Sequence, residues 1–529
     1  MDIPSLFMIP SAVSSGKVHS VFPNSTDADF DFNRDSSATR VNSQGLIEEV
    51  GYFGSELVTN GSFDADSNWS KGTGWSIANG KASKVAGSAA ELTQASVFPS
   101  GFLSKTFRIT FTLEVTAGSV RLRAGTNSQS YLNSSGTYSY TLTPAGNDQL
   151  KFDANSSFAG SVDNVSVKEL TGDRARLNYE IEGGLVNSKP SLLLEPQSTN
   201  LIPYSEDFSQ WINQNSIDIA NQITSPDGNN KGTKVESTST SSNYIYRQIT
   251  LATSTAYSIS VFVKKGTSNI ARLDIFDTVG GTEASIRINL DTEATSFING
   301  TASFEKFPND WYKLKVSFTS SSSLGTSFFR VFQESGVSGQ YIYVFGAQLE
   351  QQSYCTSYIP TNGSTQTRAA ETCNGAGTSS IFNDSEGILF AELKNIANDG
   401  TNKCIAISRG LTVDNRVTIV VGTGDNVIRP HIIKDGVAVF DLTTNSFNTV
   451  DNFVKIAVRY KTNDFACWVN GTQALTDTSG DVPTGLNTLK FDVGNNTLPF
   501  YGKIRDIRVY NTKEMTDSEV DILLNKITS

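Results

Sequence analysis

Short runs in which apolar and polar residues alternate, separated by turn-forming clusters, recur along most of this 529-residue chain. FRITFTLEV (107–115), YSISVFVKK (257–265) and FVKIAVRY (453–460) are three such runs. Successive side chains of a β-strand point to opposite faces of a sheet, so the alternation predicts half-buried strands. Turn clusters of Gly, Asn, Asp and Ser fall about every 8–12 residues, a spacing typical of β-sandwiches. The chain is therefore predicted to be all-β.

The runs group into three tandem β-sandwiches, which agrees with a soft prior of about 150 residues per domain. The first two share an opening pattern and a closing strand, so we expect two related jelly rolls. The expected parts are an irregular N-terminal attachment segment over 1–55, a first sandwich over 56–170, a connector over 171–200, a second sandwich over 201–360, a linker over 361–378 and a third sandwich over 379–529.

Charge and hydropathy exclude two classes of partner. The 42 basic and 53 acidic residues give a net charge of −11, spread along the chain. Nucleic-acid binding needs clustered Lys and Arg, so it is not expected. No apolar stretch approaches the ~20 residues that span a bilayer. The N-terminus carries Asp2 and no basic region, so we expect no signal peptide, and synthesis in a cytoplasm.

The four cysteines, Cys355, Cys373, Cys404 and Cys467, show neither CxxC spacing nor an adjacent histidine. Free thiols in a reducing compartment are the first interpretation. A bridge between the first two or between the last two stays open as the alternative.

Residues for catalysis are scarce. Only His19 and His431 are available for a triad or a zinc site, and a structural histidine is the favoured interpretation for each. Paired carboxylates could hydrolyse glycans, but the chain has no Glu-x-Asp-x-x-Glu string that would set them on one strand face. Glu519 and Asp521 come nearest and lie in a predicted terminal helix. We therefore predict that the protein is not an enzyme.

Tryptophan rings are natural platforms for sugars, because a flat ring stacks on the C–H face of a pyranose. Trp69, in a polar turn, and Trp211 are the candidate glycan-binding residues, and Trp69 is expected to be exposed. Core packing is the alternative for both, and it is favoured for Trp75, Trp311 and Trp468, which stand in strand-like patterns.

The turn before Trp69 also suggests calcium. Asp64, Asp66 and Asn68 have the first spacings of a calcium loop, but Trp69 stands where an EF-hand needs glycine, so that loop type is excluded.

NGSF (60–63), Trp75 and the closing Asp163-Asn164 pair resemble carbohydrate-binding jelly rolls appended to glycanases and phage proteins. That resemblance implies a structural calcium near the opening and closing strands, with Asp163 and Asp64 as its ligands. WVNG (468–471) and GKIRDIRVYN (502–511) resemble concanavalin A-like, laminin-G-type sandwiches.

ATRVN (38–42), LLEPQSTNL (193–201), GAQLE (346–350) and TRAA (367–370) resemble bacteriophage virion proteins. In such proteins the first two runs usually lie close in sequence. Here the first sandwich separates them, so we interpret it as an inserted domain and expect residues 38–50 and 174–200 to pack together.

The resemblance implies a tail-fibre or head-fibre protein of the virion, made in the host cytoplasm without membrane insertion. The N-terminal segment would attach to other virion proteins, and the sandwiches would bind host cell-surface glycans. Weak binding per module would be strengthened by a homo-oligomer, with a trimer favoured. Two alternatives remain: a purely structural capsid decoration or collar protein, and a glycan-binding or glycan-degrading protein of bacterial origin.

Overall fold

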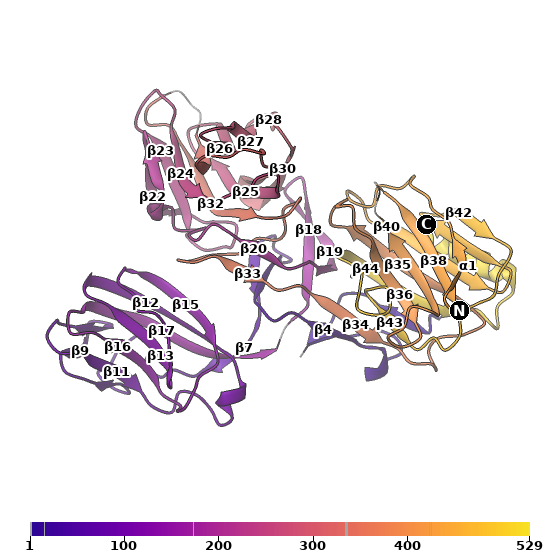
Figure 1. The fold of residues 1–529 in the computed structure, drawn as a ribbon, viewed down its shortest axis with the longest axis horizontal. Coiled ribbons are helices and arrows are strands. Elements are labelled where there is room, and N and C mark those ends of the chain that lie inside the picture. The colour runs from indigo at the N-terminus through magenta and orange to yellow at the C-terminus, as the bar shows by residue number, and fades with distance from the viewer. Residues whose placement is uncertain (1–2, 15, 173, 334–336, 423, 425) are drawn as a thin grey trace. The chain divides into compact units, whose positions relative to one another are not determined.

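The computed structural model describes residues 3–14, 16–172, 174–333, 337–422, 424 and 426–529. It is nearly all β, and antiparallel strands form three two-sheet sandwiches (Figure 1). The predicted fold class, tandem β-sandwiches, is therefore confirmed. The chain divides into two compact units, Gly51–Gly172 in one and Met1–Val50 with Asp173–Ser529 in the other.

The first sandwich fills the unit Gly51–Gly172, with a six-stranded and a five-stranded sheet around a core of apolar side chains. The six-stranded sheet contains β15 (Gly136–Leu142), β12 (Phe107–Ala117), β17 (Ala159–Gly172), β10 (Lys81–Lys84) and β9 (Trp75–Ala78), with β7 (Tyr52–Glu56) beside β17. The second sheet contains β14 (Asn127–Ser128), β13 (Val120–Ala124), β16 (Leu150–Ala154), β11 (Ala90–Gln94) and β8 (Ser70–Lys71).

The second sandwich has two six-stranded sheets with its own apolar core. One sheet has the order β21 (Ile212–Gln214), β24 (Tyr244–Ile249), β31 (Ser327–Phe332), β26 (Ile270–Asp277), β27 (Gly281–Asn289) and β28 (Thr295–Ile298). The other has the order β22 (Ser216–Ile223), β23 (Gly232–Ser237), β32 (Tyr341–Glu350), β25 (Ala256–Lys265), β30 (Trp311–Thr319) and β29 (Thr301–Phe307).

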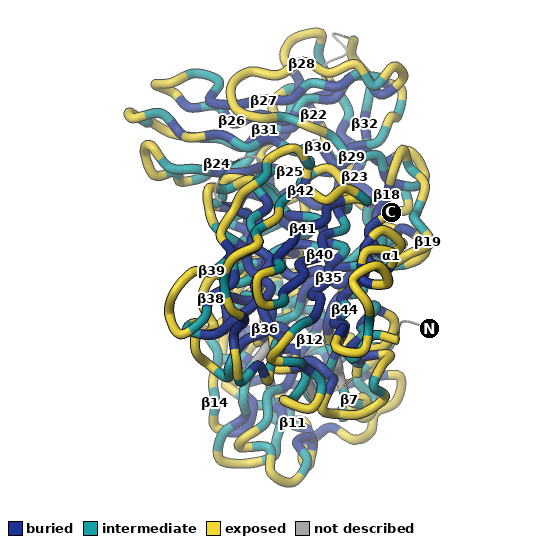
Figure 2. Tube along the Cα trace, turned by 90° about the vertical axis from the view of Figure 1, so that its right-hand side faces the viewer, coloured by how far each residue is buried: buried dark blue, intermediate teal, exposed yellow. Residues whose placement is uncertain are grey.

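The third sandwich pairs an eight-stranded with a nine-stranded sheet, and its core strands are among the segments coloured as buried in Figure 2. The eight-stranded sheet contains β18 (Arg176–Glu182), β19 (Leu185–Leu194), β44 (Gly502–Asn511), β35 (Glu386–Asn395), β40 (Val454–Lys461), β41 (Phe465–Val469) and β42 (Thr472–Asp477), with β1 (Leu6–Met8) beside β44. The other contains β2 (Val13–Ser14), β3 (Lys17–Val18), β4 (Phe30–Asn33), β34 (Thr372–Ala376), β43 (Thr488–Lys490), β36 (Lys403–Ser408), β37 (Arg416–Val421), β38 (Ile428–Lys434) and β39 (Val437–Asp441).

Three segments that we expected outside the third sandwich belong to its sheets, and these expectations were wrong. The irregular N-terminal attachment segment (1–55) supplies β1, β3 and β4, in which Phe30 and Phe32 are buried between exposed polar residues. The connector (171–200) supplies β18 and β19, and the linker (361–378) supplies β34, which buries Cys373. The pairings join residues such as Leu6 and Val509, so no local pattern could reveal them.

A hairpin of β5 (Ala38–Val41) and β6 (Ile47–Val50) lies against β18. The backbone nitrogen of Val41 donates to Asn178 Oδ1 at 2.9 Å, and Arg176 Nη1 donates to the carbonyl of Thr39 at 2.9 Å. Ile47 packs with apolar side chains of the second sandwich. The chain thus leaves this hairpin at Val50 and comes back beside it at Arg176, after the first sandwich.

Behind this hairpin, five charged side chains form a buried charge network, with each side chain at most 3% exposed: Arg34, Arg176, Glu195, Arg368 and Glu371. Arg176 contacts both carboxylates, Nε to Glu371 Oε1 at 2.8 Å and Nη2 to Glu195 Oε2 at 2.8 Å. Arg34 joins Glu371 at 2.7 Å, and Arg368 joins Glu195 at 3.0 Å. Buried charges are tolerated only when paired and hydrogen-bonded, as these are.

For Glu195 and Arg176, the effect of the ion pairs on the pKa outweighs the effect of burial. Burial alone raises the pKa of Glu195, but Arg368 and Arg176 bring it well below its ordinary value. Burial lowers the pKa of Arg176, and Glu371 and Glu195 raise it above its usual range. Glu195 and Arg176 therefore stay ionised in the folded protein at neutral pH.

Helix α1 (Asp517–Thr528) covers the outer face of the eight-stranded sheet. Thr516 and Glu519 form a capping box at its start, which satisfies its first backbone N–H groups. Leu523 and Leu524 pack on Phe390 and the neighbouring apolar residues of the sheet. Nowhere in the described residues is there a helix long and apolar enough to cross a membrane.

A candidate glycan-binding site

The two tryptophans predicted as sugar platforms are core residues, so that prediction was wrong. Trp69 is only 6% exposed, its Nε1 donates to the carbonyl of Asn60 at 3.1 Å, and its ring lies 5.2 Å from that of Phe63. The polar turn folds back through residues with positive φ, including Asn60 and Phe63, and inserts the indole into the core. Trp211 is 5% exposed and meets Phe329 edge-on at 5.6 Å.

The two aspartates predicted as calcium ligands make local hydrogen bonds instead. Asp64 Oδ2 accepts from Ser62 Oγ at 2.7 Å, and Asp163 Oδ1 accepts from the backbone nitrogen of Asn164 at 2.6 Å. Among the described residues, no group of three or more His, Cys, Asp or Glu side chains could hold a metal ion. Calcium also accepts backbone carbonyl oxygens, so a calcium site at Asp64 and Asp163 stays a prediction.

All four cysteines are free thiols. Burial raises the pKa of Cys404 and of Cys467 to about 12, and that of Cys355 to about 11. Thiols with such pKa values are protonated at neutral pH, so they are poor nucleophiles.

The second sandwich carries an aromatic surface that sequence reasoning missed. On β24, β31 and β26, one set of alternate residues faces the core, and the other set faces outward. We give the name aromatic face to eight residues of the outward set: Tyr244, Tyr246, Arg272, Asp274, Phe276, Phe328, Arg330 and Phe332. Five of these eight side chains are rings, and four of the five rings are partly exposed.

Strand register places the eight residues in rows across the three strands. Tyr246 lies opposite Arg330, and Arg330 lies opposite Asp274. The ring of Tyr244 is 4.6 Å from that of Phe332, and the ring of Tyr246 meets that of Phe328 edge-on at 5.5 Å. Cross-strand neighbours hold one another in place, so the rings are fixed on a rigid sheet.

Arg330 lies at the centre of the aromatic face. Its Nε and Nη2 donate to the two oxygens of Asp274 at 2.7 and 2.9 Å, and that carboxylate is completely buried. The guanidinium also lies over Phe276, 4.3 Å from the ring centroid. Arg272 pairs with the same carboxylate at 3.2 Å. The face therefore combines flat rings with fixed polar groups that can donate to sugar hydroxyls.

The five-stranded sheet of the first sandwich offers a contrast. Its outward residues are mostly charged and form ion pairs, such as Arg121 with Asp153 at 2.7 Å and Lys151 with Glu91 at 3.0 Å. Tyr131 lies beside them, under Arg121. A surface of paired charges is typical of a solvent-exposed sheet face and does not indicate a ligand.

The signal for the aromatic face is present in the sequence. YIYRQI (244–249) places aromatic residues at positions i and i+2 of the outward-facing side of a strand, and SFFRVF (327–332) places them at i and i+4. Ile245 and Val331 point to the core. Aromatic rings on the outward side of adjacent strands expose apolar surface to water, which is unfavourable. They therefore indicate a binding surface more strongly than a single tryptophan in a turn does.

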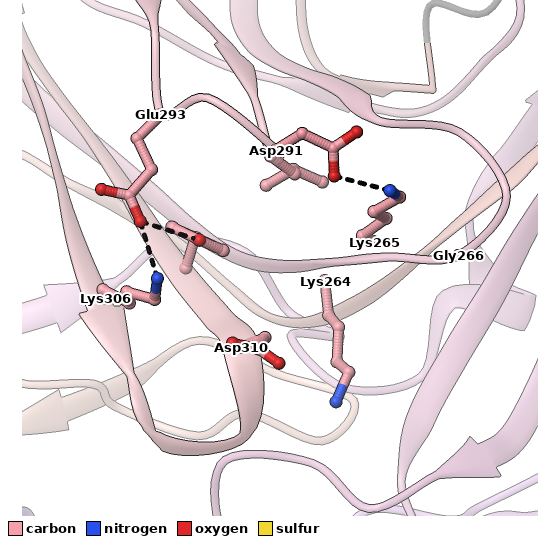
Figure 3. A pocket seen from close by; sticks show the side chains of 9 residues that line it. Lys264, Lys265, Gly266, Asp291, Glu293, Lys306 and Asp310 are labelled. Carbon is pink, nitrogen blue, oxygen red and sulfur yellow. Dashed lines mark hydrogen bonds and ion pairs between the residues drawn. The ribbon is translucent and has the colours of Figure 1, made fainter. Parts of the chain in front are cut away.

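A pocket of about 410 Å³ opens elsewhere on the second sandwich, where β25 ends near the turn after β27 (Figure 3). Lys265 Nζ donates to Asp291 Oδ1 at 2.5 Å, and Lys306 Nζ donates to Glu293 Oε1 at 2.7 Å. The hydroxyl of Tyr312 donates to the same oxygen of Glu293 at 3.0 Å. The pocket is thus lined by charges that largely neutralise one another.

The carboxylates of this pocket are suited to accepting hydrogen bonds. Hydrogen bonding from Lys306 and Tyr312 lowers the pKa of Glu293, and hydrogen bonding from Lys265 lowers that of Asp291. A general acid for glycoside hydrolysis needs a raised pKa, so neither group fits that role. A polar ligand must also compete with the existing ion pairs, which makes this pocket a weaker candidate than the aromatic face.

Comparison with known proteins assigns part of the third sandwich. Residues 394–521 match the family model described as the Concanavalin A-like lectin/glucanases superfamily. This match lies within the part of the chain that resembles laminin-G-type sandwiches, and it covers less than half of the chain. No curated protein sequence matches the chain significantly.

Two solved structures match the chain at low similarity. One is the N-terminal CBM22-1–CBM22-2 tandem domain of Xyn10C from Paenibacillus barcinonensis, at 10% identity and a TM-score of 0.21, covering 57% of this chain and 98% of that one. The other is the tandem CBM51 modules of Sp3GH98, a family 98 glycoside hydrolase from Streptococcus pneumoniae, at 9% identity and 0.18, covering 64% and 99%. Scores this low carry no conclusion about function.

Proposed function

We propose that the protein is a surface component of a bacteriophage particle, a tail or head fibre, that binds host cell-surface glycans without cleaving them. The aromatic face of the second sandwich is the observation that carries the glycan-binding part. Tyr244 and Tyr246 offer ring faces, and Arg330, held by Asp274, offers oriented N–H donors. The lectin-type family match of residues 394–521 supports the same class of ligand.

The virion part of the proposal is supported by the sequence runs that resemble phage proteins. Glu195 of the 193–201 run and Arg368 of the 367–370 run meet in the buried charge network, and Thr39 of the 38–42 run accepts a hydrogen bond from Arg176. The runs therefore belong to one structural junction. Since residues 6–8 and 30–33 are strands of the third sandwich, attachment to other virion proteins is proposed for the folded chain and not for a free N-terminal arm.

Affinity for a flat sugar-binding face is modest, so we propose a homo-oligomer, a trimer in a fibre, in which avidity strengthens attachment. A purely structural decoration protein is the competing function. It would share the sandwiches and the buried charge network but would not need the aromatic face.

Two experiments test the two parts separately. Purified protein is applied to host cells and to a glycan array, and binding to a defined set of glycans is expected. Electron micrographs of phage particles labelled with antibody to this chain are expected to show it on the particle surface. Labelled particles without any glycan or cell binding would favour the structural role, whereas unlabelled particles would overturn the virion assignment.

A further inference from the structure

The outer face of the nine-stranded sheet contains a buried cation without a counter-ion. Arg416, at the start of β37, is 7% exposed. Its Nη1 donates to the carbonyl of Val413, its Nη2 donates to His431 Nδ1 at 3.2 Å, and its Nε has no partner. In the part of the chain that the structure describes, no carboxylate pairs with this guanidinium. A buried charge without a partner is costly, so the position calls for an explanation.

The acid beside His431 on this face is already occupied. Asp441, beside His431 on β39, forms two hydrogen bonds with Arg429, one of them to Nη2 at 2.7 Å. Its Oδ2 lies 4.0 Å from His431 Nε2, beyond hydrogen-bonding distance. Arg429 therefore neutralises the charge of Asp441, and the positive charge of Arg416 is left without a counter-ion.

Two more donors lie on the same face. Thr418 follows Arg416 by two residues, lies directly opposite His431, is fully buried, and its hydroxyl has no partner. His431 accepts from Arg416 at Nδ1, so its proton is on Nε2. Burial, Arg429 and Arg416 lower the pKa of His431 to about 4, which keeps the ring neutral. Thr418 pairs on its other side with Ala406, and Ala406 pairs in turn with Lys490.

We propose that Arg416, Thr418 and His431 form an anion site that takes the carboxylate or sulfate group of an acidic glycan. The guanidinium provides charge and two or more N–H donors, and the threonine hydroxyl and the imidazole N–H complete the set. Beside the buried Arg416 and Thr418, the side chain of His431 is 17% exposed and that of Arg429 is 31% exposed. The anion site follows from the geometry alone, whereas the choice of a glycan as carrier rests on the proposed function.

Thermal unfolding at constant ionic strength tests the site with inorganic sulfate against chloride. Sulfate is expected to raise the melting temperature of the wild type and of Lys461→Gln, a control on the opposite sheet, but not of Arg416→Gln. Without sulfate, Arg416→Gln is expected to melt no lower than the wild type, because it removes an unbalanced buried charge. Thr418→Val, which keeps the size of the side chain, is expected to weaken the sulfate effect. An equal sulfate effect in Arg416→Gln would overturn the site.

The carrier is tested by calorimetry with a uronic-acid oligosaccharide and a neutral oligosaccharide of the same length. The wild type is expected to bind the acidic sugar at least tenfold more tightly than Arg416→Gln does, with no such difference for the neutral one. Stabilisation by sulfate without binding of the acidic sugar would overturn the glycan assignment. Binding of neutral glycans through the aromatic face is measured separately. A failure to bind the acidic sugar therefore does not contradict the proposed function.

Discussion

Arg330 binds Asp274 through two parallel hydrogen bonds, from Nε to Oδ1 at 2.7 Å and from Nη2 to Oδ2 at 2.9 Å, under the rings of the aromatic face. The bidentate geometry fixes the plane of the guanidinium, which in turn lies 5.3 Å from the ring centroid of Tyr244. A sugar that stacks on these rings therefore meets a donor that is already oriented, which lowers the entropy lost on binding.

Asp274→Asn tests this pair. The change leaves Arg330 and Arg272 without their carboxylate in a largely buried position, so we expect a loss of about 3 kcal/mol in unfolding free energy. Urea denaturation followed by tryptophan fluorescence measures it, because Trp211 lies in the same core. Asp291→Asn, which breaks an exposed pair of the same sandwich, is the control and should change little. Equal effects of the two substitutions would show that burial of the Arg330 pair is unimportant.

The buried charge network gives a second prediction. Glu371→Gln removes the carboxylate that Arg34 and Arg176 share, and breaking a buried pair from one side costs about 3–5 kcal/mol. Urea unfolding monitored by Trp311, which packs in the cluster containing Ile47, reports the loss. Glu293→Gln at the exposed pocket is the matched control, with an expected change below about 1 kcal/mol. A Glu371→Gln protein as stable as the control would contradict the role of the network.

Trp69→Ala separates core packing from sugar binding. Removing a buried indole costs about 3–5 kcal/mol, so we expect the first sandwich to melt at a lower temperature or to become sensitive to protease. Glycan binding through the second sandwich should persist, because residues 51–172 form their own compact unit. Loss of glycan binding with unchanged melting would instead restore Trp69 as a sugar platform.

His431 gives a pH prediction. Its pKa is about 4 in the folded protein and about 6.5 when unfolded, so the unfolded chain binds more protons between these values. The contribution of this group to stability is therefore complete above about pH 6.5 and falls as the pH drops towards 4. Melting temperatures of the wild type and of His431→Gln across this range measure it. Parallel curves for the two proteins would contradict the lowered pKa.

The sequence was sufficient for the fold class because the alternation in runs such as 107–115 is local. It was insufficient for the strands that complete the third sandwich. Leu6 pairs with Val509, and Asn33 pairs with Thr372, so the pairing partners of β1 and β4 lie hundreds of residues away in the chain. Two short strands and a Gly-rich segment resembled a loose arm and a linker because their partners were not apparent.

The candidate site was missed for a different reason. Trp69 stands among polar residues, which suggested exposure, but its backbone turn directs the indole inward to Phe63 and Phe152. Tyr244 and Tyr246 were not among the candidates, because only tryptophans were considered as sugar platforms, and their side chains face outward from the strand. The polarity of neighbouring residues is thus a poor guide to whether a side chain is exposed when the direction of one turn decides where that side chain points. The side of the sheet to which a strand residue points is a better guide.

The central claim is that the aromatic face binds host glycans, and a double substitution, Tyr244→Ala with Tyr246→Ala, tests it most directly. The measurement is the dissociation constant for the glycan selected by the array, with unfolding monitored in parallel. At about 1 kcal/mol for each stacked ring, we expect binding to weaken about thirtyfold. Tyr131→Ala, on the charged face of the first sandwich, should bind like the wild type. Unchanged affinity in a folded double variant would contradict the account.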